Sequence, residues 1–133
     1  MWMTRTSVTL LLSLALEAGA TETVEGEWET GAMLYQRYCA TCHGPDGAGD
    51  GPAAGALRDL PADLRRLAAR HDGRYPQRLV RRSLDGRGMP LAHGTREMPI
   101  WGRQWRRDGT AGNEAEIDAT IVKLNSYLRS IQE

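Results

Sequence analysis

The feature that most constrains this 133-residue chain is the pentapeptide Cys39-Ala40-Thr41-Cys42-His43. Two cysteines three positions apart lie on one face of a helical turn, and a histidine directly after the second can bind a metal held on that face. This spacing is the signature of c-type haem attachment. It predicts that the two thiols form thioether bonds with the haem vinyl groups and that the His43 imidazole binds the iron.

Two other kinds of site use the same residue types. A thioredoxin-like redox pair is expected beside a βαβ pattern, with one cysteine exposed at a helix N-terminus. Here the pair precedes a glycine-rich run at residues 44–51, and no strand pattern flanks it. A zinc site with two cysteines and two histidines needs the histidines about three to five residues apart, whereas His71 and His93 are 22 apart. Covalent haem is therefore the favoured interpretation.

The first 20 residues have the pattern of a secretory signal peptide. Residues 1–5 are weakly basic, residues 8–16 are apolar, and residues 18–20 form a small-residue cleavage site. A retained N-terminal anchor is the alternative, but the apolar stretch is shorter than the roughly 20 residues that span a bilayer. We expect a signal peptide over residues 1–20, one domain over residues 21–133, and a periplasmic location without stable membrane insertion.

Charge is unevenly distributed, although the formal net charge is zero. Residues 21–50 carry six acidic residues and one arginine, a net charge of −5, and residues 58–107 carry thirteen arginines and five acidic residues, a net charge of +8. The basic segment is suited to docking an acidic redox partner. Solvated helix faces, with one or two arginines neutralising haem propionates, are the simpler explanation of most of these side chains. The acidic flanks argue against nucleic-acid binding.

Helical patterns account for much of the remaining sequence. We predict helices over residues 30–43, 61–72 and 76–84, with Gly44 ending the first as a left-handed cap. Residues 102–112 are expected to form a basic, flexible link.

A final helix is predicted to begin at Asn113, which can cap it together with Glu116. It carries an apolar stripe with helical spacing, formed by Ile117, Ile121, Leu124, Leu128 and Ile131. We expect this stripe to pack inside the domain.

The sixth iron ligand has to come from downstream of the haem motif. Met98 is the preferred candidate, because Pro99 restricts its backbone and Trp101 can wall the haem edge and direct its indole N–H to a propionate. Met89 also precedes a proline but has no tryptophan after it. His93, or a sixth position left vacant or filled by water, are the further alternatives.

Four local patterns, in this order, resemble the class I bacterial cytochromes c. They are the run Gly-x-x-Leu-Tyr from Gly31, the haem motif with its following Gly-Pro, the Met-Pro-x-Trp-Gly loop, and the closing pair Leu124-x-x-Tyr127. The resemblance implies an all-α cytochrome c fold, with about four helices wrapped round one covalently attached haem c. It also implies that Gly31 and Tyr35 form a close crossing with the C-terminal helix.

The resemblance further implies that the carbonyl of Pro52 accepts the hydrogen bond of the His43 imidazole. Such a bond would fix the tautomer of the ring and raise its basicity as a ligand.

Ligation by both His43 and a methionine would leave the iron no open position, so that it could only gain or lose one electron. The first hypothesis is therefore a periplasmic one-electron carrier that forms transient complexes with redox proteins and has no enzymatic activity or small-molecule substrate. The second is a haem c subunit of a dehydrogenase or oxidase complex, with Trp28 and Trp105 at its interface. An enzymatic or gas-sensing function would need an open distal position.

Overall fold

The computed structural model describes residues 29–87 and 97–133 of the chain. These residues form α-helices and short 3-10 turns, with no β-strand among them, so the predicted all-α class is confirmed. In chain order the elements are α1 (Gly31–Tyr38), α2 (Ala40–His43), η1 (Ala54–Ala56), η2 (Leu64–Arg66), η3 (Ala69–His71), α3 (Gln77–Asp85), α4 (Trp101–Asp108) and α5 (Glu114–Ser130). The predicted signal peptide, Trp28, Met89 and His93 lie outside the described residues.

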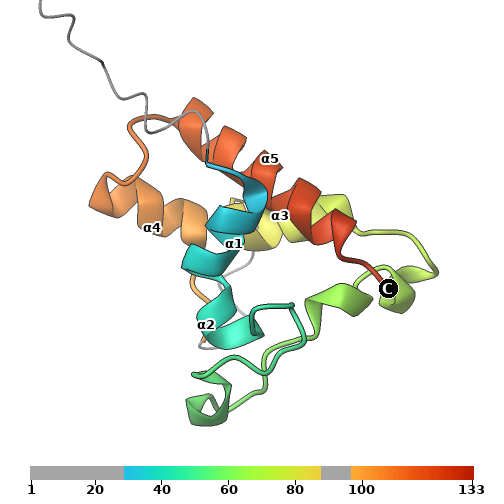
Figure 1. The fold of residues 1–133 in the computed structure, drawn as a ribbon. Helices are drawn as coiled ribbons and strands as arrows, with labels where there is room; N and C mark the ends of the chain where they lie inside the picture. Colours follow the sequence, from blue (N-terminus) through green and yellow to red (C-terminus); the bar gives the residue numbers. More distant parts are fainter. Residues whose placement is uncertain (1–28, 88–96) are drawn as a thin grey trace, which may run out of the picture.

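A close crossing of α1 and α5 organises the helices (Figure 1). A Cβ atom added at Gly31 would overlap the carbonyl oxygen of Lys123 and lie 2.9 Å from the Cβ of Tyr127. The rings of Tyr35 and Tyr127 pack beside this point, with their centroids 5.1 Å apart. The glycine-and-aromatic crossing predicted from the sequence is therefore confirmed.

Both crossing helices begin at capping side chains, and the cap at Asn113 is the predicted one. The hydroxyl of Thr30 accepts the N–H of Met33 at 3.2 Å, and the side chain of Asn113 accepts the N–H of Glu116 at 3.0 Å. The stripe on α5 faces inward and joins the buried cluster formed by Leu34, Tyr35, Cys39, Val80, Leu84, Trp105, Ile117, Ile121, Leu124 and Leu128. Helix α3 lies within one residue of its predicted bounds, and Gly86 ends it in the left-handed conformation.

Residues 61–72 do not form the α-helix that we predicted. The chain makes only the two 3-10 turns η2 and η3 there. Its main chain is bonded to distant segments instead, because Leu64 donates to the carbonyl of Gly47 at 2.7 Å and the carbonyl of Arg65 accepts the N–H of Glu133 at 3.0 Å. Asp63 also accepts the N–H of Arg65 through its side chain, an alternative to helical bonding.

The expected link at residues 102–112 is a helix for most of its length. Helix α4 covers Trp101–Asp108 and ends at Gly109, which has a φ of 72°. Trp105 anchors it in the core, with a side chain only 2% exposed. Burial of this tryptophan explains why a sequence rich in arginine is nonetheless ordered as a helix.

Candidate functional site

The haem motif occupies the junction of α1 and α2. Cys39 lies between the two helices, where its N–H donates to the carbonyl of Tyr35 at 2.8 Å and its own carbonyl accepts the N–H groups of Cys42 at 3.1 Å and His43 at 2.9 Å. The helical path thus runs through Cys39 almost without a break. The structure brings the three predicted attachment residues together within one turn, as the spacing requires.

The two cysteines do not form a disulfide, and they differ in exposure. Cys39 is 6% exposed, and burial together with the neighbouring Cys42 raises its pKa to about 12. Thioredoxin-like cysteines instead have a lowered pKa, because the thiolate is the attacking species. The environment of Cys39 therefore argues against a redox-active thiol pair.

His43 is 8% exposed, and its ring is oriented by one hydrogen bond. Its Nδ1 atom lies 2.9 Å from the carbonyl oxygen of Ala62. Because a carbonyl only accepts, Nδ1 carries the proton and Nε2 keeps the lone pair that an iron ligand needs. Burial lowers the pKa of His43, which favours this neutral form, although the bond to Ala62 acts in the opposite direction.

Our prediction that Pro52 supplies this carbonyl was wrong. The glycine-rich loop folds back on the motif, where Gly51 donates to the carbonyl of Cys42 at 3.1 Å and Ala53 donates to that of Thr41 at 2.9 Å. Pro52 is exposed between these two bonds. The chain reaches the imidazole only ten residues later, at Ala62, and a main-chain acceptor leaves no signal in the side-chain sequence.

The predicted distal residues lie close to the start of α4. Trp101 is its first residue and packs on the ring of Tyr38, with centroids 5.1 Å apart, directly before Cys39 in the chain. Met98 comes three residues earlier and is 37% exposed. Met98 and Trp101 remain predicted haem contacts, and the rival candidates Met89 and His93 fall in the undescribed segment.

Trp105 is a buried donor that the sequence analysis did not single out for haem. Among the described atoms, its indole Nε1 has no hydrogen-bond acceptor, although the side chain is buried. An unmatched buried donor is costly, and a haem propionate is an acceptor of the required kind. The ring lies 5.2 Å from Tyr38 and 6.2 Å from Trp101 between centroids, so the residues present fit a haem group on this side.

The same burial contradicts the interface role considered for Trp105. A side chain in the core cannot contact a partner protein. Trp28, the other tryptophan proposed for such an interface, is not among the described residues.

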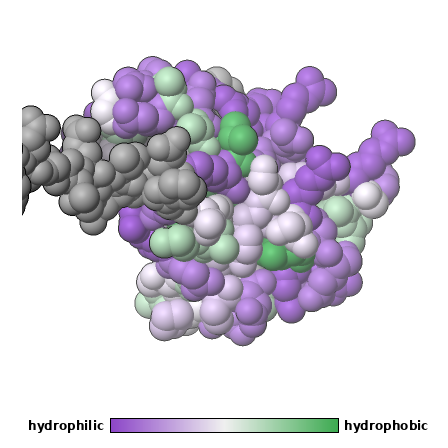
Figure 2. Space-filling view, turned by 45° about the horizontal axis from the view of Figure 1, so that its top comes forward, coloured by the Kyte–Doolittle hydropathy of each residue, from purple (hydrophilic) through white to green (hydrophobic). Residues whose placement is uncertain are grey.

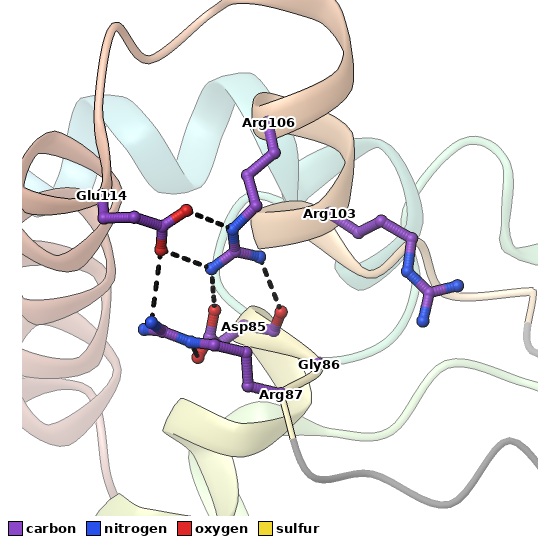
Figure 3. A pocket seen from close by; sticks show the side chains of 6 residues that line it. All are labelled: Asp85, Gly86, Arg87, Arg103, Arg106 and Glu114. Atoms are coloured by element: carbon purple, nitrogen blue, oxygen red, sulfur yellow. Dashed lines mark hydrogen bonds and ion pairs between the residues drawn. The ribbon is translucent and has the colours of Figure 1, made fainter.

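Several arginines of the basic segment are held in ion pairs where α3, α4 and α5 meet (Figure 3). The buried carboxylate of Asp85 pairs with Arg106 at 2.6 Å and with Arg87. Glu114 on α5 pairs with Arg106 at 2.7 Å and with Arg87 at 3.2 Å. These groups border an open cavity of about 460 Å³, which Arg103 also lines without a drawn bond to the other five residues. The cluster ties three helices together, so these arginines have a structural role.

A family model matches residues 26–119, which is more than half of the chain. Its description is cytochrome c oxidase, cbb3-type, subunit III. The chain belongs to this family. It is accordingly a monohaem cytochrome domain of the class I type, with covalently bound haem c and iron, and it serves haem-based electron transfer.

The searches of curated proteins and of solved structures gave no match to this cytochrome. Over residues 29–87 and 97–133, the cytochrome contains no helix that is long and apolar enough to cross a membrane.

Proposed function

We propose that this cytochrome carries single electrons in the periplasm through one haem c, attached at Cys39 and Cys42 and ligated by His43 and Met98. The observation that carries the proposal is the state of His43. Its buried ring is bonded through Nδ1 to the carbonyl of Ala62, so that Nε2 carries no proton and keeps the lone pair that an iron ligand needs.

The protein side chains set the properties of this electron carrier. Haem c, when bound, supplies a reversible one-electron couple at its iron. His43 donates a nitrogen lone pair whose basicity the Ala62 carbonyl raises. Met98 is a soft thioether, which favours the ferrous state and raises the potential above that of a two-histidine site. Because His43 and Met98 would fill both of the iron coordination positions that the haem leaves open, no substrate could bind the metal. We therefore infer no enzymatic activity.

The exposed surface supports brief encounters with redox partners. On the face in Figure 2, hydrophilic residues predominate and the strongly hydrophobic residues form small, separate patches. Among the described residues, the large apolar side chains that are exposed are Met33, Leu60, Leu79, Met98 and Val122. Scattered apolar residues of this kind are usual on monomers and do not mark a permanent interface.

A second function is favoured by the family description, which names an oxidase subunit. In that case the same haem passes electrons within a stable complex. Purification from the native membrane and periplasmic fractions in high salt distinguishes a free carrier from a subunit of a complex. A carrier elutes alone from gel filtration at the size of the mature domain, whereas a subunit stays with its partners.

Binding of carbon monoxide tests the closed iron site. The ferrous protein at neutral pH is expected to bind the gas slowly or not at all, because Met98 occupies the distal position. Rapid binding would contradict stable methionine ligation and favour a gas-binding or enzymatic role.

A further inference from the structure

Glu97, the residue before Met98, is bonded to a distant part of the chain. Its Oε1 accepts the N–H of Arg58 at 2.8 Å, and its Oε2 accepts the N–H of Asp59 at 3.1 Å. One carboxylate therefore engages two successive main-chain donors with both of its oxygens. Bonds between a charged acceptor and main-chain groups are stronger and better fixed in direction than contacts between two flexible side chains.

The donors belong to a segment that is itself tied to the haem motif. Upstream of them, the N–H groups of Gly51 and Ala53 bind the carbonyls of Cys42 and Thr41. The turn η1 follows directly and leads to Arg58. A continuous path of hydrogen bonds and short chain thus connects the haem-attachment helix with the carboxylate of Glu97.

The chain on the other side of Met98 is also held. Gly86 ends α3, and a Cβ atom placed there would overlap the side chain of Ile100. Ile100 therefore rests directly on the end of α3, which the Asp85 ion pairs join to α4. Met98 is bracketed by an electrostatic anchor at Glu97 and a packing anchor at Ile100.

We propose that Glu97 is a positioning residue for Met98: by binding the main chain of Arg58 and Asp59, it holds the methionine at a fixed distance from the haem-attachment helix. The inference rests on the proposed ligation by His43 and Met98. A thioether is a weak ligand. The fraction of molecules in which it binds the iron therefore depends on how closely the polypeptide already holds the methionine in the binding position. Glu97 supplies that arrangement without contacting the metal.

The test uses matured protein with Glu97→Ala and the near-isosteric Glu97→Gln. Asp108→Asn is the matched control, because the Asp108 carboxylate also accepts a main-chain N–H, that of Thr110 at 3.0 Å, in a turn beyond α4. The readouts are the sulfur-to-iron charge-transfer absorption of the ferric protein, the rate at which the ferrous protein binds carbon monoxide, and the midpoint potential.

Glu97→Ala is expected to weaken the absorption, lower the potential and speed carbon monoxide binding by roughly three- to tenfold, as the loss of charge-assisted hydrogen bonds implies. Glu97→Gln should give intermediate values, because the amide keeps one acceptor oxygen. Asp108→Asn should match the wild type in all three measurements.

Wild-type values of all three readouts in Glu97→Ala would overturn the proposal, even if the variant unfolded at a lower temperature. If Glu97→Ala does not mature, Glu97→Gln decides in the same way. Met98→Ala is measured alongside: should it retain the charge-transfer absorption, the ligation itself is wrong, whatever the Glu97 variants show.

Discussion

His43 and Met98 differ in how firmly the protein holds them. His43 lies in a helical turn, is buried, and has its ring fixed by the Ala62 carbonyl. Met98 lies outside the helices and is 37% exposed. At the scale of single residues, we therefore expect the proposed methionine ligand to be more sensitive to substitution of its neighbours than His43.

Met98→Ala is expected to remove the weak charge-transfer absorption of a sulfur-bound ferric haem and to lower the reduction potential, because a thioether favours the ferrous state. Met89→Ala is the matched control, since Met89 also precedes a proline, and should change neither property. Visible spectra and redox titrations of the matured proteins measure both. The reverse pattern would make Met89 the ligand.

At the scale of the elements, the fold depends on how closely α1 approaches α5. Gly31 permits this approach because any side chain there meets the main chain at Lys123. The rings of Tyr35 and Tyr127 then fill the space beside the crossing, and the hydroxyl of Tyr35 donates to the carbonyl of Gly44 at 2.6 Å. The crossing and the end of the haem motif are thereby linked through one tyrosine.

Gly31→Ala is expected to lower the free energy of unfolding by about 1–3 kcal/mol, the usual range for overpacking a tight contact. Gly55→Ala is the control, because no atom lies within 4 Å of a Cβ atom placed at Gly55, and little change is expected. Chemical denaturation followed by circular dichroism measures both. Equal midpoints for the two variants would argue against the close crossing.

Asp85 is expected to make the packing of α3, α4 and α5 less stable at low pH. Burial alone would raise its pKa, but hydrogen bonds from Arg106 and Arg87 outweigh burial, and the pKa lies below its ordinary value of 3.8. A carboxylate whose pKa is lowered by folding stabilises the protein above its unfolded pKa, and this contribution is lost as the pH falls through the folded pKa.

Asp85→Asn should therefore destabilise the protein by about 2 kcal/mol at pH 7, since two arginines lose a buried partner. The difference from wild type should shrink below pH 3.8. Asp59→Asn, which alters an exposed pair with Arg58, should have little effect at any pH. Denaturation midpoints between pH 2 and 7 test this, and a constant difference across that range would contradict it.

The sequence predicted those elements whose ends are determined by residues that are neighbours along the chain. The cap at Asn113, the bounds of α3 and the stripe on α5 are indicated by a few neighbouring residues, and the structure agrees with them. The turn η2 was not predicted because its main chain is bonded to distant segments. Helix α4 was not predicted because its two tryptophans pack on Tyr38, which belongs to α1 and is far from them along the chain.

The same distinction applies to the site. Cys39, Cys42 and His43 form a local pattern, which one helical turn realises. The acceptor for His43 and the bonds of Glu97 join residues 19 and 38 to 39 positions apart. No spacing rule along the chain indicates such contacts.

At the scale of the whole molecule, the described core is small, and most of its buried side chains are aliphatic. Its largest fully buried side chains are Trp105, Tyr35, Ile117, Ile121 and Leu124, and the chain contains no phenylalanine. A short chain with a core of this size is marginally stable by itself. The haem group would add the large apolar surface that the side chains lack.

The same sequence produced without haem attachment is therefore expected to show less helical circular dichroism and a lower melting temperature than the matured protein. Since the two samples share one sequence, each serves as the control for the other. Calorimetry and far-ultraviolet spectra provide the measurement. Coinciding melting curves would show that the polypeptide alone supplies the stability.

The burial of Cys39 also bears on how the protein is made. Cys39 belongs to the buried cluster and is only 6% exposed. An assembly enzyme that joins a vinyl group to the sulfur of Cys39 has to act before the residues of this cluster pack around it. Biogenesis should accordingly follow a fixed order, in which the cofactor is ligated to a still-open polypeptide and final compaction comes afterwards.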